Sequence, residues 1–385
     1  MKKIGISTVY TGYNYGSALQ AFAVKTICTK LGYSGEVLHL RGSLIPGRDV
    51  RIGKALMITL RMLCCFQKGI KSIKAYAGAL AKTTPKEVQP IFDAFIAEYI
   101  KPVTTSWYGL KILGKREEYV SFICGSDQIW NADVLYVDPQ YYLRYAPQYK
   151  RIAYAPSFGR HCIPDYNKQI IGKYVSQIPY LSVREDTGIS IIKEIADRES
   201  VCLLDPTLYF NRSEWIELLQ LKLQPPKTPY VLAYFLDEPS EQAKFYIRKI
   251  SETRNWKVVC LPYTQVNSDW FDCSEIAGPI EFIRLLANAN FVCTDSFHGT
   301  AFSVNMQVPF YTFERQYRAA SKQSARIESL LDLVNLRHRY CPMGNELELT
   351  IDFKVCEEIL NTEKERTNNY LLSALEDIKN HNGDK

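Results

Sequence analysis

Short apolar runs alternate with helical patterns along most of the chain. Lys2–Val9 is an apolar run that predicts a buried strand, and Ala18–Leu31 carries apolar residues at helical spacing. Gly32 ends the helical pattern, and Glu36–Leu40 is a second apolar run. A strand, a helix and another strand in this order predict a β-α-β unit with a parallel sheet.

The same alternation continues in two series, one on each side of the proline-rich segment PPKTP at residues 225–229. The expected strands are Val120–Cys124, Arg151–Ala155, Tyr180–Val183 and Val201–Leu204 before it, and Tyr230–Phe235, Lys257–Leu261, Phe291–Thr294 and Pro309–Phe313 after it. Helices are expected within Pro239–Arg254, within Pro279–Ala289 and in a segment ending at Asn305. We therefore predict an N-terminal Rossmann-like domain (1–224), a C-terminal Rossmann-like domain (225–345), and a C-terminal helix with a polar, disordered tail (346–385).

Composition limits the class of protein. The 385 residues suit two domains, and the net charge of +6 does not by itself indicate a nucleic-acid partner. The 11 cysteines form no CxxC pair or zinc-ligand spacing, which favours a reducing compartment over a disulfide framework or a zinc site. There is no apolar signal-peptide core near the N-terminus, and the longest apolar stretch, Ala55–Phe66, is too short to span a membrane. We expect a cytoplasmic protein.

One segment is strongly basic. Residues 41–82 contain nine Lys or Arg and one acidic residue, Asp49, with large apolar residues interleaved. This pattern is typical of a helix at an anionic membrane surface. An ordinary helical insertion with a solvated basic face is the alternative.

Polar residues and glycines collect in the loops that follow the predicted strands. In parallel α/β sheets, ligands bind beyond the carboxyl ends of the strands, so these loops predict a common site. They are TGYNYGS (11–17), GSDQIW (125–130), APSFG (155–159), SVRED (182–186), LDPT (204–207) and TDSFHG (294–299).

Three of these loops each allow two interpretations. TGYNYGS precedes a helix and would either bind an anion at the helix N-terminus or form a tight capped turn. Asp127 would either cap the next segment or bind substrate hydroxyls, and Trp130 would either be core or stack on a sugar face. Arg184 suits a carboxylate or a phosphate, unless it pairs with Glu185 or Asp186 on the surface.

Three further residues complete the set. Asp205 precedes a proline and is more consistent with a strand end or a turn than with a site. Arg326 precedes an amphipathic pattern and is either an anion ligand or a solvated helix residue. His298 lies near a predicted helix N-terminus, which disfavours its charged form, whereas Asp295 would favour that form. Such an imidazole suits general acid–base chemistry, with a buried hydrogen-bonded histidine as the alternative.

Six motifs occur in an order that resembles the polysaccharide pyruvyl transferase family, from residue 1 to about residue 335. They are NYGSALQAF (14–22), GSDQIWN (125–131), SVRED (182–186), DPTL (205–208), TDSFHGTAFS (294–303) and SARIESLL (324–331). The resemblance implies an α/β, GT-B-like fold of two doubly wound Rossmann-like domains facing a central cleft. It also implies transfer of the pyruvyl group of phosphoenolpyruvate to two hydroxyls of a glycan sugar. The resulting pyruvate ketal belongs to a bacterial capsule, exopolysaccharide or cell-wall glycan.

The resemblance implies that His298 and Arg184 are catalytic. The expected donor-binding residues are Arg184, Ser296, Phe297, His298, Gly299 and Arg326, and the expected acceptor-binding residues are Asn14, Tyr15, Gly16, Ser17, Asp127, Gln128 and Trp130. Ser296 departs from the family, because some members have an arginine two residues before the histidine. We expect Arg326 or Arg315 to replace that contact.

The expected partners are phosphoenolpyruvate and a lipid-linked or nucleotide-linked oligosaccharide, with segment 41–82 at the inner face of the plasma membrane. No metal, separate cofactor or nucleic acid is expected.

Two other functions fit parts of the sequence. A sugar-nucleotide-dependent glycosyltransferase would use the same two-domain cleft, and a non-catalytic glycan-binding assembly partner would explain the serine at 296.

Overall fold

A computed structural model describes residues 1–41, 59–60, 63, 86–132, 137–262, 270–315, 324–344 and 346–383. Apart from Arg41, Thr59, Leu60 and Leu63, the predicted basic segment 41–82 lies outside the described residues. None of the helices within the described ranges is both long and apolar enough to cross a membrane.

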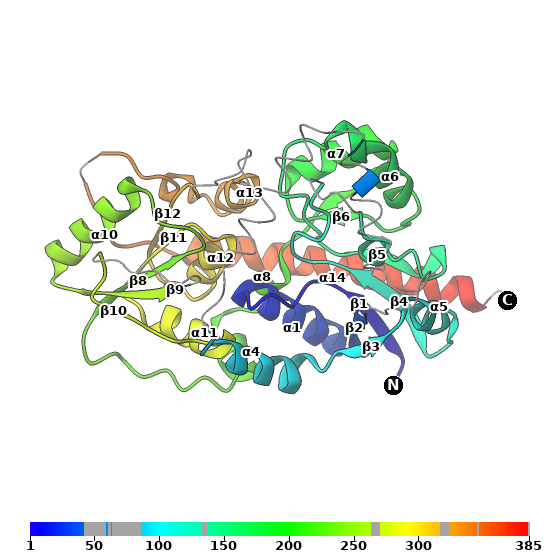
Figure 1. Cartoon of the computed structure of the whole chain (residues 1–385), viewed down its shortest axis with the longest axis horizontal. Helices are drawn as coiled ribbons and strands as arrows, with labels where there is room; N and C mark the ends of the chain where they lie inside the picture. The colour runs from blue at the N-terminus through cyan, green and yellow to red at the C-terminus, as the bar shows by residue number, and fades with distance from the viewer. Residues whose placement is uncertain are drawn as a thin grey trace.

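The first half of the chain forms a parallel five-stranded sheet in the order β3-β2-β1-β4-β5 (Figure 1). The strands are β1 (Lys3–Ser7), β2 (Ser34–Leu40), β3 (Val103–Thr105), β4 (Tyr119–Cys124) and β5 (Arg151–Ala153). A parallel pair, β6 (Ser182–Val183) and β7 (Val201–Cys202), follows. The helices of this half are α1 (Tyr15–Lys30), α4 (Gln89–Phe95), η1 (Ile96–Ile100), α5 (Trp107–Lys115), η2 (Pro139–Tyr142), η3 (Gln148–Lys150), α6 (Asp165–Val175), α7 (Asp186–Ala196), α8 (Pro206–Tyr209) and α9 (Arg212–Leu218).

The second half forms another parallel five-stranded sheet, in the order β10-β9-β8-β11-β12. Its strands are β8 (Tyr230–Phe235), β9 (Lys257–Pro262), β10 (Cys273–Ser274), β11 (Phe291–Thr294) and β12 (Phe310–Thr312). Its helices are α10 (Glu241–Arg254), α11 (Pro279–Asn288), α12 (Phe297–Asn305), α13 (Ala325–Leu333) and η4 (Arg337–Arg339). The short edge strands β3 and β10 were not predicted, because neither has a recognisable apolar run.

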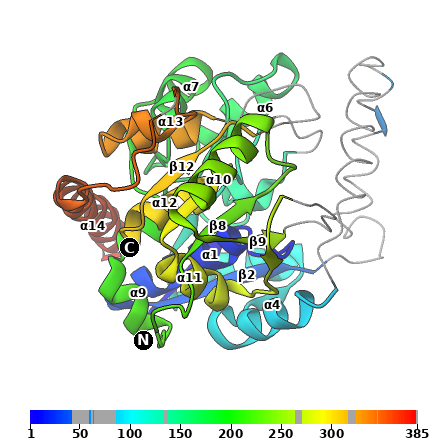
Figure 2. The ribbon, with the colours of Figure 1, turned by 90° about the vertical axis from the view of Figure 1, so that its left-hand side faces the viewer.

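Strand β8 shows why this sheet is covered on both faces. All six of its residues are buried, and Val231 packs with α10 whereas Leu232 packs with α11 and α12. Because successive side chains of a strand point to opposite faces, a continuous apolar run requires helices on both sides. Figure 2 shows α10 and α11 on either side of β8.

The two sheets lie side by side and share one hydrophobic cluster, which includes Ile4 of β1 and Leu232 of β8. Tyr15 joins the two halves: its ring stacks on Phe282 of α11 at 4.7 Å, and its hydroxyl donates to the Ala277 carbonyl. The predicted α/β, GT-B-like arrangement of two doubly wound sheets is confirmed. The exact domain boundaries remain a prediction.

The last helix, α14 (Lys354–Gly383), returns from the second sheet to the first (Figure 1). Lys364 forms an ion pair with Glu214 at 2.9 Å, and the Tyr370 hydroxyl donates to the Ala153 carbonyl of β5. The predicted closing helix is therefore confirmed, but it continues to Gly383. The expected disordered tail is wrong over that range, because apolar residues such as Leu375 and Ile378 are buried along the helix.

Candidate active site

Both sheets contribute to a cavity of about 400 Å³ at the carboxyl ends of their strands. From the first half it is lined by Val9, Asn14, Ser17, Asp127, Gln128, Ile129, Asn131, Val137, Asp138, Tyr141 and Tyr142. From the second half it is lined by Leu236, Ser296, Phe297, His298, Arg315 and Arg326. The predicted position of a site beyond the strand ends agrees with this geometry.

Two helix N-termini meet at this cavity. Asn14 caps α1 by accepting from the Ser17 N–H at 3.1 Å, and Ser296 caps α12 by accepting from the Gly299 N–H at 3.3 Å. His298 is the second residue of α12 and is 6% exposed. Gly16 packs directly on its ring, because a Cβ at Gly16 would lie only 1.9 Å from His298 Nδ1.

Beside His298 lies a buried ion-pair cluster. Arg184 directly follows β6, and its side chain is 1% exposed. Its Nη1 donates to Asp205 Oδ2 at 2.5 Å, and its Nη2 lies 3.8 Å from Asp127 Oδ1. The guanidinium carbon lies 4.4 Å from the centre of the Phe297 ring, so Arg184 also contacts the second half of the chain.

Both carboxylates of the cluster are held by further hydrogen bonds. Asp205 Oδ1 accepts from the backbone N–H and the hydroxyl of Thr207, at 2.9 and 2.7 Å, and caps α8. Its Oδ2 also accepts from the Ser126 hydroxyl at 3.1 Å and lies 3.9 Å from His298 Nε2. Asp127 Oδ2 accepts from the Ser17 hydroxyl at 2.6 Å.

These contacts determine the charge states. Burial would raise the pKa of Asp205, but Arg184, His298 and the hydrogen bonds from Thr207 and Arg184 lower it to about 2. Burial would also raise the pKa of Asp127. His298, Arg184 and the hydrogen bond from Ser17 outweigh the effect of burial, so this pKa is lowered as well. Both carboxylates are therefore ionised at neutral pH.

His298 is affected in the opposite sense. Burial lowers its pKa below the ordinary value of 6.5, and Arg184 and Arg326 act in the same direction, against Asp205 and Asp127. The imidazole is therefore neutral at pH 7 and able to accept a proton. Asp205 and Asp127 are the carboxylates that act most strongly on its pKa, and the Asp295 carboxylate accepts from the Leu236 N–H.

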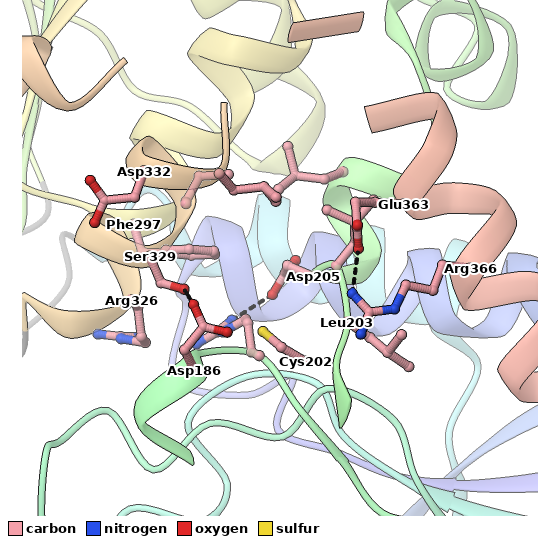
Figure 3. Close-up of a pocket in the computed structure, with 15 residues that line it drawn as sticks. Asp186, Cys202, Leu203, Asp205, Phe297, Arg326, Ser329, Asp332, Glu363 and Arg366 are labelled. Carbon is pink, nitrogen blue, oxygen red and sulfur yellow. Dashed lines mark hydrogen bonds and ion pairs between the residues drawn. The ribbon is translucent and has the colours of Figure 1, made fainter. Parts of the chain in front are cut away.

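A second cavity of about 320 Å³ lies behind the ion-pair cluster, between α13, α14 and the loop after β7. Figure 3 shows Asp205 and Phe297 at its wall, with Arg326 and Ser329 coming from the α13 side. The Ser329 hydroxyl donates to Asp186 at 3.3 Å and so joins the two halves. Arg326 lines both cavities.

The structure brings most of the predicted residues together. Asn14, Ser17, Asp127, Gln128, Ser296, Phe297, His298 and Arg326 line the larger cavity, Arg184 adjoins it, and Gly16 supports His298. The alternative in which Arg184 pairs with Glu185 or Asp186 is wrong, because its partners are Asp205 and Asp127. The Gly299 N–H is already used by the Ser296 cap.

Two predicted acceptor contacts are wrong. Trp130 is 0% exposed, its ring stacks on Tyr142 at 5.3 Å, and its Nε1 donates to the Tyr141 carbonyl. Tyr15 is packed between α1 and α11, as described above. Their large apolar surfaces are used in the core, and neither ring can stack on a ligand in this arrangement.

Sequence reasoning missed the part that Asp205 has in the cluster. The available signal was its position at the end of a predicted strand, at the same sheet edge as Arg184. Tyr141 of the cavity wall was also missed, since it lies on a short 3₁₀ turn without an apolar pattern. No group of three or more His, Cys, Asp or Glu that could hold a metal ion occurs in the part of the chain that the structure describes.

The fold and the cavity together define a GT-B-like protein with a neutral histidine, two ionised carboxylates and arginines at an inter-sheet site. The chain belongs to the polysaccharide pyruvyl transferase family, whose model matches residues 14–317. No curated protein is significantly similar to the chain in sequence.

Three solved structures to which the chain is similar share little sequence identity with it. S. aureus MnaA in its UDP co-structure has a TM-score of 0.45 and 12% identity, with 96% of this chain and 97% of that chain covered. UDP-GlcNAc 2-epimerase from Neisseria meningitidis has a TM-score of 0.44 and 9% identity, with 94% and 100% covered. The E. coli heptosyltransferase WaaC has a TM-score of 0.36 and 8% identity, with 86% and 99% covered.

Proposed function

We propose that the protein transfers the pyruvyl group of phosphoenolpyruvate to two hydroxyls of a glycan sugar and forms a pyruvate ketal. The observation that carries the proposal is the neutral His298 at the cavity, beside two ionised carboxylates, in a chain of this family. Ketal formation requires each attacking sugar hydroxyl to lose a proton. A neutral imidazole at the reaction site is suited to accept it.

The donor is an anion with a phosphate and a carboxylate. Arg315 and Arg326 line the cavity from the second half of the chain. Guanidinium groups bind phosphate and carboxylate groups bidentately, so these two arginines suit the donor. Ser296 contributes no charge, and its side chain is used as the cap of α12. Arg184 lines the smaller cavity, and its Nε and Nη2 are buried without a hydrogen-bond partner among the described residues, which supports a part for it in donor binding.

The acceptor would occupy the side of the cavity formed by the first half of the chain. Asn14, Ser17, Asp127 and Gln128 offer amide, hydroxyl and carboxylate groups there. Such groups pair with sugar hydroxyls, which both donate and accept hydrogen bonds. We further propose a lipid-linked or nucleotide-linked oligosaccharide as the acceptor, with segment 41–82 holding the protein at an anionic membrane surface.

The direct test incubates the purified protein with phosphoenolpyruvate and a panel of glycan acceptors, and measures both phosphate release and the ketal product. Acceptor-dependent phosphate release with an equal amount of ketal would support the proposal. If the folded protein releases no phosphate with any acceptor, and nucleotide sugars raise its melting temperature where phosphoenolpyruvate does not, a glycosyltransferase would replace it.

Replacing Arg326 by alanine is expected to weaken phosphoenolpyruvate binding at least about tenfold, since a hydrogen bond to a charged group contributes about 1.5–3 kcal/mol. Calorimetry measures this directly. Arg248→Ala on the exposed face of α10 is the matched control and should bind like the wild type. Unchanged affinity in Arg326→Ala would instead place the donor anion on Arg315 or Arg184.

A further inference from the structure

The two ring nitrogens of His298 have different surroundings. Nε2 is buried, has no hydrogen-bond partner among the described residues, and lies 3.9 Å from Asp205 Oδ2. Nδ1 faces the backbone of Gly16 at the start of α1, where the glycine leaves space that a Cβ would fill. The histidine is therefore held between a fixed carboxylate on one side and a residue without a side chain on the other.

The Asp205 carboxylate has little freedom to turn away. One oxygen accepts two hydrogen bonds from Thr207, and the other accepts from Arg184 and from the Ser126 hydroxyl. An ionised carboxylate can only accept hydrogen bonds. The Asp205 carboxylate attracts a protonated Nε2 that faces it, whereas it repels the lone pair of an unprotonated Nε2. In a neutral imidazole one nitrogen carries the proton and the other carries the lone pair, so the proton belongs on Nε2.

We infer that Asp205 is a positioning residue that holds neutral His298 as the Nε2–H tautomer, so that Nδ1 is the nitrogen that exchanges protons with the substrate. Gly16 is required because the ring occupies the space of a side chain there: a Cβ would lie 1.9 Å from Nδ1, so any side chain would displace the ring. The separation of 3.9 Å between Nε2 and Oδ2 is longer than a hydrogen bond. Catalytic hydrogen bonds are often long or poorly aligned without substrate, so this distance is compatible with a contact that forms in the substrate complex.

The part of Nδ1 in a reaction rests on the proposed function. The assignment of the Nε2–H tautomer is independent of that function. In the proposed transfer, each of two sugar oxygens bonds to C2 of the donor as its O–H bond breaks, and the proton passes to Nδ1. The first proton goes on to C3 as the C2=C3 double bond is broken. The second leaves with the phosphate as the bond between C2 and the phosphate oxygen is broken. The imidazolium formed then has an N–H on each nitrogen, and Asp205 stabilises its positive charge through Nε2–H. Arg184 keeps Asp205 ionised while this happens.

Charged groups reach His298 from four parts of the chain. Asp205 lies in the loop after β7 and Asp127 in the loop after β4, and both favour the protonated ring. Arg184 at the end of β6 and Arg326 on α13 disfavour it. Asp205 Oδ2 lies 3.9 Å from Nε2, so Asp205 selects the tautomer while both carboxylates affect the charge.

Nitrogen NMR of the ¹⁵N-histidine-labelled full chain tests the inference without a substrate. His298→Gln identifies the two ring signals by their disappearance. At a pH above 7, the wild type should show a protonated Nε2 and an unprotonated Nδ1. A proton on Nδ1 would overturn the inference whatever the activity of the protein. Absence of phosphate release would overturn only the proposed function, so the two failures are distinguishable.

Two variants refine the test. Asp205→Asn removes a carboxylate that favours the charged ring, so the pKa of His298 should fall and the population of the Nδ1–H tautomer should rise. Asp127→Asn is the matched control: the pKa should also fall, but the Nε2–H tautomer should persist. An unchanged tautomer in folded Asp205→Asn contradicts the role of Asp205. If that variant does not fold, the wild-type tautomer alone still decides the assignment of Nδ1.

Discussion

Replacing His298 by glutamine is expected to lower the rate of pyruvyl transfer by about 10²–10⁴-fold, the usual contribution of a general acid or base. Glutamine keeps a polar side chain of similar length at the second residue of α12 but cannot exchange a proton. Arg326 and Arg315 are unchanged, so the affinity for phosphoenolpyruvate should remain within a fewfold of the wild type. Phosphate release at saturating donor and acceptor measures the first effect, and calorimetry measures the second.

His338→Gln is the control, because this histidine has a side chain that is 51% exposed and lies beside Glu348, away from the cavity. It should transfer pyruvyl groups at the wild-type rate. A His298→Gln protein with nearly full activity would remove this residue from the proton transfer. The pH dependence gives a further check: the wild-type rate should fall as the pH drops through the lowered pKa of His298, below 6.5, because the protonated ring no longer accepts a proton.

Replacing Asp205 by alanine is expected to destabilise the protein by about 3–5 kcal/mol, the usual cost of removing one partner of a buried ion pair. Arg184 would lose its 2.5 Å contact, and its charge would be left buried with only the more distant Asp127. The cap of α8 would be lost as well. The shift of the urea unfolding curve measures the effect.

A second substitution separates the ion pair from other roles of Asp205. In the Asp205→Ala background, Arg184→Met removes the uncompensated charge, so the double variant should be less destabilised than the sum of the two single variants. Glu199→Ala is the surface control, since its side chain is 87% exposed in a pair with Lys193, and no measurable change is expected. Simple additivity of Asp205→Ala and Arg184→Met would mean that the pair contributes no coupling energy.

The contribution of Asp205 to stability should also depend on pH in a definite direction. Its pKa in the folded protein, about 2, lies below the ordinary value of 3.8. A carboxyl group with a lowered folded-state pKa stabilises the protein above its unfolded-state pKa and loses this effect as the pH falls through the folded-state value. The stability difference between wild type and Asp205→Asn should therefore shrink between about pH 4 and pH 2.

The serine at position 296 has a structural explanation. Its side chain caps α12, the helix that carries His298, and thereby orients the first turn of that helix. In the proposed donor site, positive charge comes from α13 and from the loop after β12, which carry Arg326 and Arg315. An arginine at 296 is then not needed for the site to bind an anion.

The alternation of apolar runs and helical patterns was enough to predict the two parallel sheets, the cleft and the loops that line it. This works because the carboxyl ends of parallel strands meet at one edge, so residues after different strands are brought together by the topology alone. His298 could be placed at a helix N-terminus because the predicted strand Phe291–Thr294 is followed by a short polar loop and a helical pattern. The central strands were predicted well because their apolar runs are buried on both faces.

Only the tertiary structure decided what each of these residues contacts. Trp130 and Asp127 stand in the same loop, yet the first packs in the core and the second faces the cavity. Asp205 belongs to the site because it pairs with Arg184. The two ring nitrogens of His298 differ because one lies near Asp205 and the other packs on Gly16. These contacts join residues from different strands and from both halves of the chain. Local periodicity reports which side of an element is buried, but it carries no information on which distant side chain lies there.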